Sequence, residues 1–339
     1  MTTSFSSLPI IDVGALREQK LPSEVDHLSR QLYDAFSTTG FAYLTNLPLG
    51  FDHEEIFGLS REFFALPLVE KMKLAKQSFH PKNQNTYRGY FPIQPHLALD
   101  NLKEGFELGL PGQDCTTSTL RAKINLSEPN VWPSGNVFTK RERLEQMYGE
   151  LQAFASQLLS LLAVSLGKGP GFFDSWLVNS LSTLRLLHYP AVSQGPKSVY
   201  DDGPVKLSCT PHTDSGILTL LHQDTTGGLE VLNASGEWVA APYVPGSIVV
   251  NIGDLMATVS GGRFSATMHR VRAPPPKAGA DFGRFSIPFF FEPGEQCVVI
   301  SVDGSEESVV YGEHVKKKMS TWVEFQEDSG YDTGSTEEM

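Results

Sequence analysis

From about residue 181 onward, the chain is a succession of short, strand-like apolar runs separated by turn signals such as NASGE and VPGS. The runs are STLRLLHY, GILTLLHQ, GLEVLN, EWVAAP, SIVVNIG, FSATMHRV, RFSIPFFFEP and CVVISV. A long series of short strands with regular turns predicts a sandwich or a closed barrel.

Helical patterns predominate before that point. In SEVDHLSRQLYDAFSTTG the apolar residues recur at helical spacing, with Ser23 as the expected N-cap and Gly40 as the expected stop. A second helix is expected around 53–65. The strongest helical pattern covers 139–167, and its apolar stripe consists of Leu144, Met147, Leu151, Phe154, Leu158 and Leu161.

These patterns together predict a mainly β fold with N-terminal α-helices, in which a double-stranded β-helix (jelly roll) is flanked by helices. Residues 1–137 are expected to form a mixed α/β segment packed on the barrel, and 138–323 a helix plus the β core. Residues 324–339 are rich in acids and poor in apolar residues, so a disordered tail is expected there. Without a linker or a repeat, the first two parts are expected to share one core.

The charge balance narrows the class of partner. The chain has 339 residues, with 27 Lys and Arg against 39 Asp and Glu, and its formal net charge is −12. Such a chain is a poor candidate for binding nucleic acid or an anionic membrane. Three cysteines without paired spacing favour a reducing compartment, and there is no leader or long apolar run. A cytoplasmic protein is therefore expected, and the oligomeric state is left open.

His212 and Asp214 are the first candidate site residues. They lie two positions apart in CTPHTDSGILTLL, where the pattern becomes apolar. If both are on one strand, they project from the same face. A solvated face or a plain hydrogen-bonded pair would also explain them, so a metal site requires a third ligand.

His269, in FSATMHRV, is the preferred third ligand because a later strand of the same barrel can bring it back to the pair. Two His and one carboxylate with open positions are the signature of non-haem Fe(II) oxygenases, whereas structural zinc is closed by four protein ligands. His188 and His222 are the main competing histidines; His222 follows an apolar run and is also explained as a packed strand residue.

Arg284 and Ser286 form a second pair, again two apart on one predicted strand, in GRFSIPFFFEP. A guanidinium and a hydroxyl that converge in a barrel interior can hold a carboxylate. A surface salt bridge is the alternative, but the flanking Phe and Ile residues indicate an apolar lining, where an arginine without an anionic partner would be costly.

The order His-x-Asp, His, Arg-x-Ser resembles that of the iron(II)/2-oxoglutarate-dependent dioxygenases, more specifically the isopenicillin N synthase-like group. The likeness extends over nearly the whole chain through LPIIDVGAL, TTGFAYLTNLPL, KEGFELG, LRLLHYP, HTDSGILTLLHQD, GGLEV, VNIGDLM, GGRFSATMHRV and RFSIPFFFEP. KEGFELG and GGRF are similar to stretches of fungal members, including thymine dioxygenase-like proteins.

The resemblance implies a role for each matching residue. His212, Asp214 and His269 would bind Fe(II), while Arg284, Ser286 and Tyr189 would bind 2-oxoglutarate; Leu187 stands where some members have an asparagine. Phe290, Arg185 and Glu107 would face the substrate. The segment 191–208 is longer than expected and is either a lid or a surface loop.

The implied function is oxidation of a small organic molecule by Fe(II), 2-oxoglutarate and O2, with release of succinate and CO2. Hydroxylation is the default outcome, and desaturation or rearrangement of the substrate are variants of it. The expected setting is secondary or nucleobase-type metabolism. No separate protein acid or base is assigned. Two alternatives stay open, an iron oxidase of the same fold that does not use 2-oxoglutarate, and a non-catalytic barrel that binds a small ligand.

Overall fold

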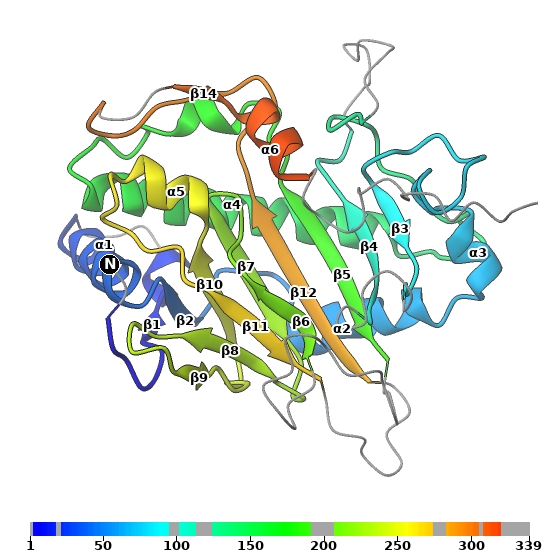
Figure 1. The fold of residues 1–339 in the computed structure, drawn as a ribbon, viewed down its shortest axis with the longest axis horizontal. Coiled ribbons are helices and arrows are strands. Elements are labelled where there is room, and N and C mark those ends of the chain that lie inside the picture. The colour runs from blue at the N-terminus through cyan, green and yellow to red at the C-terminus, as the bar shows by residue number, and fades with distance from the viewer. Residues whose placement is uncertain are drawn as a thin grey trace, which may run out of the picture.

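Two β-sheets face each other at the centre of the computed structural model (Figure 1). The structure describes residues 3–17, 22–94, 102–112, 124–190, 207–273, 283–304 and 308–319. The expected acidic tail at 324–339 and most of the segment 191–208 lie outside these residues. The boundaries proposed at 137 and 323 stay predictions.

The larger sheet has eight strands and the smaller sheet four. In spatial order the larger sheet contains β1 (Ile10–Asp12), β2 (Phe41–Thr45), β10 (Ser247–Ile252), β7 (Leu218–Gln223), β12 (Arg284–Phe291), β5 (Thr183–Tyr189), β4 (Glu104–Leu108) and β3 (Gly89–Phe91). The smaller sheet contains β6 (Leu207–His212), β11 (His269–Arg272), β8 (Leu229–Leu232) and β9 (Trp238–Ala240). A short hairpin of β13 (Val298–Val299) and β14 (Val309–Val310) stands apart from both.

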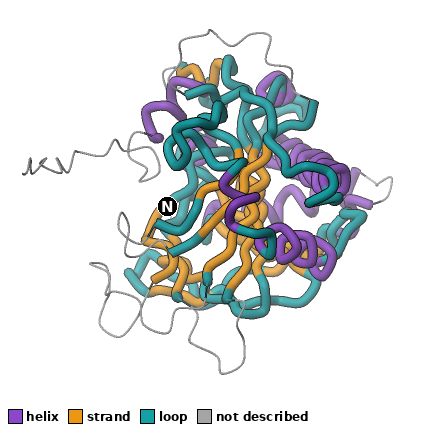
Figure 2. The backbone as a smooth tube through the Cα atoms, turned by 90° about the vertical axis from the view of Figure 1, so that its right-hand side faces the viewer, coloured by secondary structure: helices purple, strands orange, loops and turns teal. Residues whose placement is uncertain are grey.

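Helices cover the outer face of the larger sheet, as the edge view in Figure 2 shows. Those that contact this sheet are α1 (Pro22–Thr38), α2 (His53–Phe64) and α4 (Arg141–Ser165). The other helices are η1 (Gly14–Arg17), α3 (Leu68–Met72), η2 (Asp174–Leu177), α5 (Asp254–Val259) and α6 (Tyr311–Met319). The predicted helices at 53–65 and 139–167 are confirmed within two residues at each end. Among the described residues, no helix combines the length and the apolar character needed to cross a bilayer.

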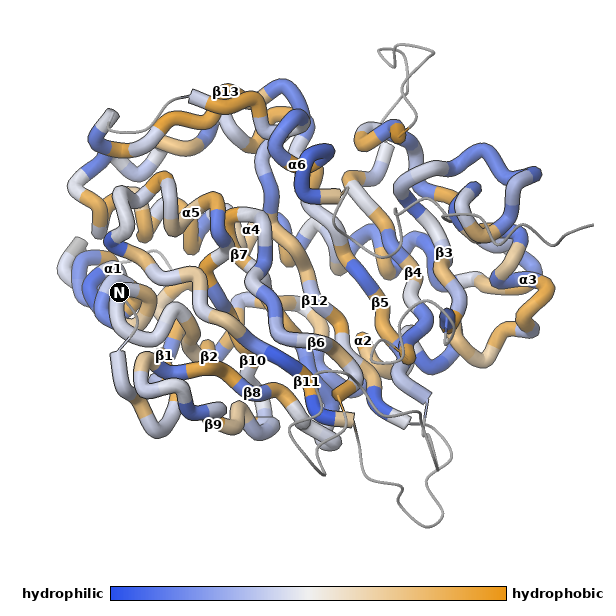
Figure 3. The backbone as a smooth tube through the Cα atoms, in the orientation of Figure 1, coloured by the Kyte–Doolittle hydropathy of each residue, from blue (hydrophilic) through white to orange (hydrophobic). Residues whose placement is uncertain are grey.

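Strand β12 shows how the period-2 alternation of a strand separates core from site. Phe285, Ile287, Phe289 and Phe291 belong to the main hydrophobic core, where Tyr148 of α4 meets Phe289 edge-on with ring centroids 5.2 Å apart. Arg284, Ser286 and Phe290 alternate with them and face the smaller sheet. Figure 3 accordingly shows β12 in mixed hydropathy colours, while α6 is mostly hydrophilic.

One hydrophobic cluster joins the N-terminal part to the barrel. It contains Phe36 of α1, Phe63 of α2, Leu151 of α4 and Phe289 of β12. Residues from both expected parts of the chain thus belong to one cluster, and the mainly β fold flanked by helices is confirmed.

The end of α1 agrees with the prediction and its start does not. Gly40 has φ +72°, and a Cβ there would lie 2.2 Å from the Ser265 carbonyl oxygen, so only glycine fits this stop. Ser23, however, lies inside the first turn rather than at the N-cap, because the helix already begins at Pro22. Proline suits that position, since it lacks a backbone N–H and a residue in the first turn has no intrahelical acceptor for one.

Candidate active site

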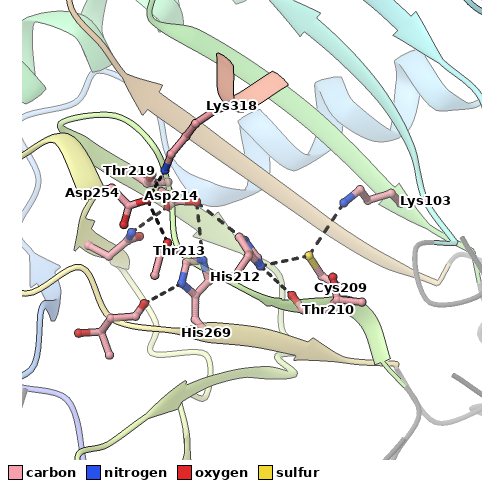
Figure 4. Close-up of polar contacts among 12 residues, drawn as sticks. Lys103, Cys209, Thr210, His212, Thr213, Asp214, Thr219, Asp254, His269 and Lys318 are labelled. Carbon is pink, nitrogen blue, oxygen red and sulfur yellow. Dashed lines mark hydrogen bonds and ion pairs between the residues drawn. The ribbon is translucent and has the colours of Figure 1, made fainter. Parts of the chain in front are cut away.

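His212, Asp214 and His269 meet between the two sheets (Figure 4). Asp214 Oδ1 lies 3.8 Å from His212 Nε2 and 3.7 Å from His269 Nε2. One donor atom from each residue falls within 4.8 Å of the other two, and the imidazole ring centroids are 4.2 Å apart. The three side chains are thus spaced to share one metal ion, and this donor set suits Fe(II).

Strand pairing explains how the two histidines come together. β6 and β11 are antiparallel neighbours, and His269 lies directly opposite His212 in their register. His212 is the last residue of β6 and His269 the first of β11. The place of His269 beside His212, on a later strand of the barrel, is as expected.

Asp214 reaches the site from a loop and not from a strand. β6 ends at His212, and the chain then crosses from the smaller sheet to β7 of the larger one. The shared strand face expected for His212 and Asp214 is thus incorrect. Because Asp214 lies on the crossover between the sheets, its carboxylate enters the space that both histidines face.

Backbone carbonyls orient the two imidazole rings. His212 Nδ1 donates to the Thr210 carbonyl oxygen at 2.8 Å, and His269 Nδ1 donates to that of Thr267 at 3.1 Å. These contacts turn each Nε2 toward Asp214, the orientation that a shared metal ion requires.

Burial would lower the pKa of His212, but Cys209 and Asp214 outweigh it and raise the pKa to about 9. Metal binding therefore displaces a proton from this ring. Burial and the nearby His212 lower the pKa of His269 to about 4, so this ring is neutral at pH 7.

Two polar side chains of the larger sheet hold the Asp214 carboxylate. Thr219 Oγ1 and Asn251 Nδ2 donate to Asp214 Oδ2 at 2.6 and 2.8 Å, which leaves Oδ1 directed at the histidines. Burial alone would raise the pKa of Asp214, but His269, His212 and these two hydrogen bonds more than offset it and lower the pKa. Sequence reasoning missed both donors, although each is a polar residue inside an otherwise apolar run.

Arg284 is buried on the same inner face with the end of its guanidinium unsatisfied. Its Nε donates to the Gly227 carbonyl oxygen at 2.7 Å, and its guanidinium carbon lies 4.9 Å from the centre of the Tyr189 ring. Nη1 and Nη2 have no hydrogen-bond partner among the described residues, although Arg284 is only 1% exposed. Ser286, two positions on, is buried on the same face. A buried cation with two free donors suits the carboxylate of a ligand.

The three residues expected to face the substrate also lie together. Glu107 of β4 is directly opposite Arg185 of β5, forms an ion pair with it, and also pairs with Lys76 Nζ at 2.5 Å. The Arg185 guanidinium carbon lies 4.9 Å from the centre of the Phe290 ring. Burial would raise the pKa of Glu107, but Arg185 and Lys76 outweigh it and lower the pKa to about 2.

Glu292, which follows β12, adds a carboxyl that sequence reasoning did not single out. It is buried, and its Oε2 has no hydrogen-bond partner within the described ranges. Burial raises its pKa to about 7, although Arg88 and Tyr311 act in the opposite direction. Arg185, one of the residues expected to face the substrate, also lowers the pKa of Glu292, so the two groups interact electrostatically.

The two competing histidines point away from this site. His188 Nδ1 is 2.8 Å from Glu104 Oε1, and its ring stacks on Phe285 on the outer face of the larger sheet. His222 packs against Phe51 and His53, also on that face. Both are packing residues of the sheet.

Comparison with known proteins matches two family models. The model of the 2OG-Fe(II) oxygenase superfamily matches residues 180–293, which include His212, Asp214, His269 and Arg284. The model described as the N-terminal region of non-haem dioxygenases in morphine synthesis matches residues 8–135.

Curated relatives and solved structures agree with these models. A 2-oxoglutarate-dependent dioxygenase of Didymella fabae is 35% identical over 86% of this chain and 87% of its own length. A proline hydroxylase of Petromyces alliaceus is 32% identical over 89% of this chain and 92% of its own length. The crystal structure of a full-length Neurospora crassa protein in complex with alpha-KG and thymine superposes with a TM-score of 0.76 at 26% identity, covering 93% of this chain and 97% of that one.

Proposed function

The chain belongs to the 2OG-Fe(II) oxygenase superfamily and is a 2-oxoglutarate-dependent dioxygenase that uses Fe(II) and O2, and from this premise we propose that it hydroxylates a small organic molecule. Succinate and CO2 are the expected co-products. Desaturation or rearrangement of the substrate would use the same site. Family membership favours a 2-oxoglutarate-dependent hydroxylase over an oxidase that does not use 2-oxoglutarate and over a non-catalytic barrel.

The observation that carries the proposal is the convergence of His212, Asp214 and His269 around one point. We assign these three side chains as the residues that would hold Fe(II), a ligand set that would leave positions for 2-oxoglutarate and O2. When bound, Fe(II) and 2-oxoglutarate together activate O2 and supply the oxidant. The protein holds the ligands in one geometry, with each Nδ1 engaged by a carbonyl and Asp214 Oδ2 held by Thr219 and Asn251.

Arg284, Ser286 and Tyr189 are assigned to 2-oxoglutarate. The two unsatisfied guanidinium nitrogens of Arg284 match the two oxygens of a carboxylate, and such charge-assisted pairs are strong when buried. Ser286 adds a hydroxyl on the same strand face, and the Tyr189 ring packs over the guanidinium. These three residues thus bind and orient the co-substrate.

Phe290, Arg185 and Glu107 are assigned to the substrate. Arg185 is held from one side by Glu107, yet its side chain stays 22% exposed, compared with 3% for Glu107 and for Lys76. A cation that solvent still reaches beside an aromatic ring suits a compact substrate that combines a flat or apolar ring with an oxygen acceptor. Proline and thymine, named for two relatives, are compounds of that kind. We therefore favour secondary or nucleobase-type metabolism.

Cys209 and Cys297 are both free thiols. Free thiols support the proposed cytoplasmic location, because a reducing compartment preserves them.

The test measures succinate formed from 2-oxoglutarate while small ring compounds are screened one at a time. The expected result is Fe(II)- and O2-dependent succinate release, stimulated by a true substrate that becomes one oxygen atom heavier. The Asp214→Ala variant is expected to lose this activity. Equal succinate release by Asp214→Ala and the unaltered protein would overturn the assignment.

A further inference from the structure

Helix α6, the last one within the described residues, is linked through Asp254 to the loop that carries Asp214. Lys318 of α6 forms an ion pair through its Nζ with Asp254 Oδ2, at the start of α5 (Figure 4). Asp254 Oδ2 also accepts a hydrogen bond from Thr213 Oγ1 at 3.1 Å. Thr213 lies between His212 and Asp214, so one carboxylate joins α6 to the centre of the candidate metal site.

The backbone strengthens this connection. The Asp254 N–H donates to the Asp214 carbonyl oxygen at 2.7 Å, and the Gly253 N–H donates to that of Ile217 at 3.1 Å. The two segments are in direct contact, because a Cβ on Gly253 would lie 2.2 Å from the Gly216 carbonyl oxygen. The turn between β10 and α5 therefore supports both ends of the loop that holds Asp214.

This support matters because Asp214 has no strand of its own. Its main chain is held by Asp254, and its carboxylate by Thr219 and Asn251. Metal affinity depends on how well such outer contacts fix the ligands.

The ammonium group of Lys318 balances the negative charge of the Asp254 carboxylate. Without an ammonium group, the Asp254 carboxylate would lie next to the Asp214 segment with no cation paired to it, and like charges repel. It would then be free to rotate toward water, since its side chain is 30% exposed, and Thr213 would lose its acceptor. The pair is partly open to solvent, so its direct contribution to folding is small.

We propose that Lys318 is a positioning residue for the metal site, acting through Asp254 and Thr213 on Asp214. This inference rests on the assignment of His212, Asp214 and His269 as metal ligands. Its consequence is that docking of α6 raises the affinity of the protein for its metal, although no atom of α6 serves as a ligand.

The chain offers a matched control on the same helix. Lys316 Nζ pairs with Glu295 Oε1 at 2.8 Å, which ties α6 to the segment after β12 and not to the metal loop. Lys316→Met and Lys318→Met each remove one ammonium group and one ion pair of α6. They differ in whether the lost pair leads to Asp214.

The experiment is an anaerobic calorimetric titration of the full chain with Mn(II) and then Fe(II), accompanied by thermal unfolding of the metal-free protein. Lys318→Met is expected to raise the metal Kd by roughly three- to tenfold, because outer contacts of this kind change affinity by about an order of magnitude. Lys318→Arg should stay within about twofold of the unaltered protein, as should Lys316→Met. Asp254→Ala, which removes the acceptor of Thr213 Oγ1, should weaken binding like Lys318→Met, and the double variant should add little, since the two residues act as one unit.

The outcomes separate this inference from the proposed function. If Asp214→Ala binds metal as tightly as the unaltered protein, the ligand assignment fails. If Asp214→Ala loses the metal while Lys318→Met keeps its full affinity, only the role of Lys318 is wrong. An equal loss in Lys318→Met and Lys316→Met would also contradict it, since general loosening of α6 would then be the cause. If Lys318→Met does not fold, Asp254→Ala decides the question by the same titration.

Discussion

Thr219 and Asn251 lie directly opposite each other on β7 and β10, and both donate to the same oxygen of Asp214. The pairing leaves the other oxygen of that carboxylate free to face the two histidines. A buried carboxylate with one oxygen satisfied and one directed at two imidazoles is prepared to bind a cation.

Removing either donor should weaken metal binding without removing a ligand. We expect Thr219→Val and Asn251→Ala each to raise the Kd for Mn(II) by about tenfold, the range typical of such outer contacts. Titration calorimetry measures this change directly. Asn46→Ala, which removes an exposed hydrogen bond to Asp12, is the control. Unchanged affinity in both site variants would show that Asp214 needs no support.

The Arg284→Met variant should separate co-substrate binding from stability. Because Nη1 and Nη2 of Arg284 have no hydrogen-bond partner among the described residues, replacing the guanidinium removes a buried charge without breaking bonds at these two atoms. The free energy of unfolding of the metal-free protein should therefore stay the same or rise. The KM for 2-oxoglutarate should rise roughly 10- to 100-fold, as expected for the loss of hydrogen bonds between charged groups. Steady-state kinetics and thermal unfolding measure the two effects. Arg272→Met, which removes a half-exposed cation paired with Glu230, should leave the KM unchanged.

Glu107→Gln should destabilise the fold. The change leaves Lys76 buried without its carboxylate and Arg185 without its ion pair, and breaking a buried pair costs about 3 to 5 kcal/mol. Glu54→Gln removes an exposed pair with Arg61 and should change the free energy of unfolding by less than about 1 kcal/mol. Urea unfolding of both variants provides the comparison, and equal losses would argue that the Glu107 cluster does not stabilise the protein.

Because His222 is buried in its neutral form, the folded protein should lose stability in mild acid. Burial lowers its pKa to about 3, and nearby His53 adds to that shift, so the folded protein keeps this ring neutral. The unfolded chain takes up a proton near pH 6.5, and the stability present above that pH is therefore lost progressively as the pH falls toward 3. Between pH 7.5 and 5.5, His222 should account for about 1.4 kcal/mol of lost stability.

The variant that tests this is His222→Phe, since His222 Nδ1 has no hydrogen-bond partner among the described residues and its neighbours are aromatic. Urea unfolding at the two pH values should show a smaller loss than in the unaltered protein. His27→Gln, at an exposed position of α1, should leave the pH dependence as it was. A slope in His222→Phe as steep as in the unaltered protein would assign the effect to other groups.

The parts of the site that sequence reasoning predicted depend on local alternation. Arg284, Ser286 and Phe290 share one face because β12 is regular, and the turn at Gly40 depends on the conformation of a single residue. The prediction of His269 as partner of His212 followed from the chemistry of the ligand set. Such features need no knowledge of how distant segments pack.

The features that sequence reasoning missed depend on packing between segments. Asp214 lies on a crossover rather than a strand, which no local pattern separates from the end of β6. The contacts of Asp254 with Thr213 and Lys318 join three regions of the chain, and their residue types are common on any surface. Glu292 acquires its raised pKa only when the fold buries it.

The most direct test of the account is an anaerobic crystal structure of the protein with Mn(II) and 2-oxoglutarate. The account predicts one metal ion bound by His212 Nε2, His269 Nε2 and an oxygen of Asp214, with a 2-oxoglutarate carboxylate paired to Arg284. A metal bound elsewhere, or a fourth protein ligand closing the site, would contradict it.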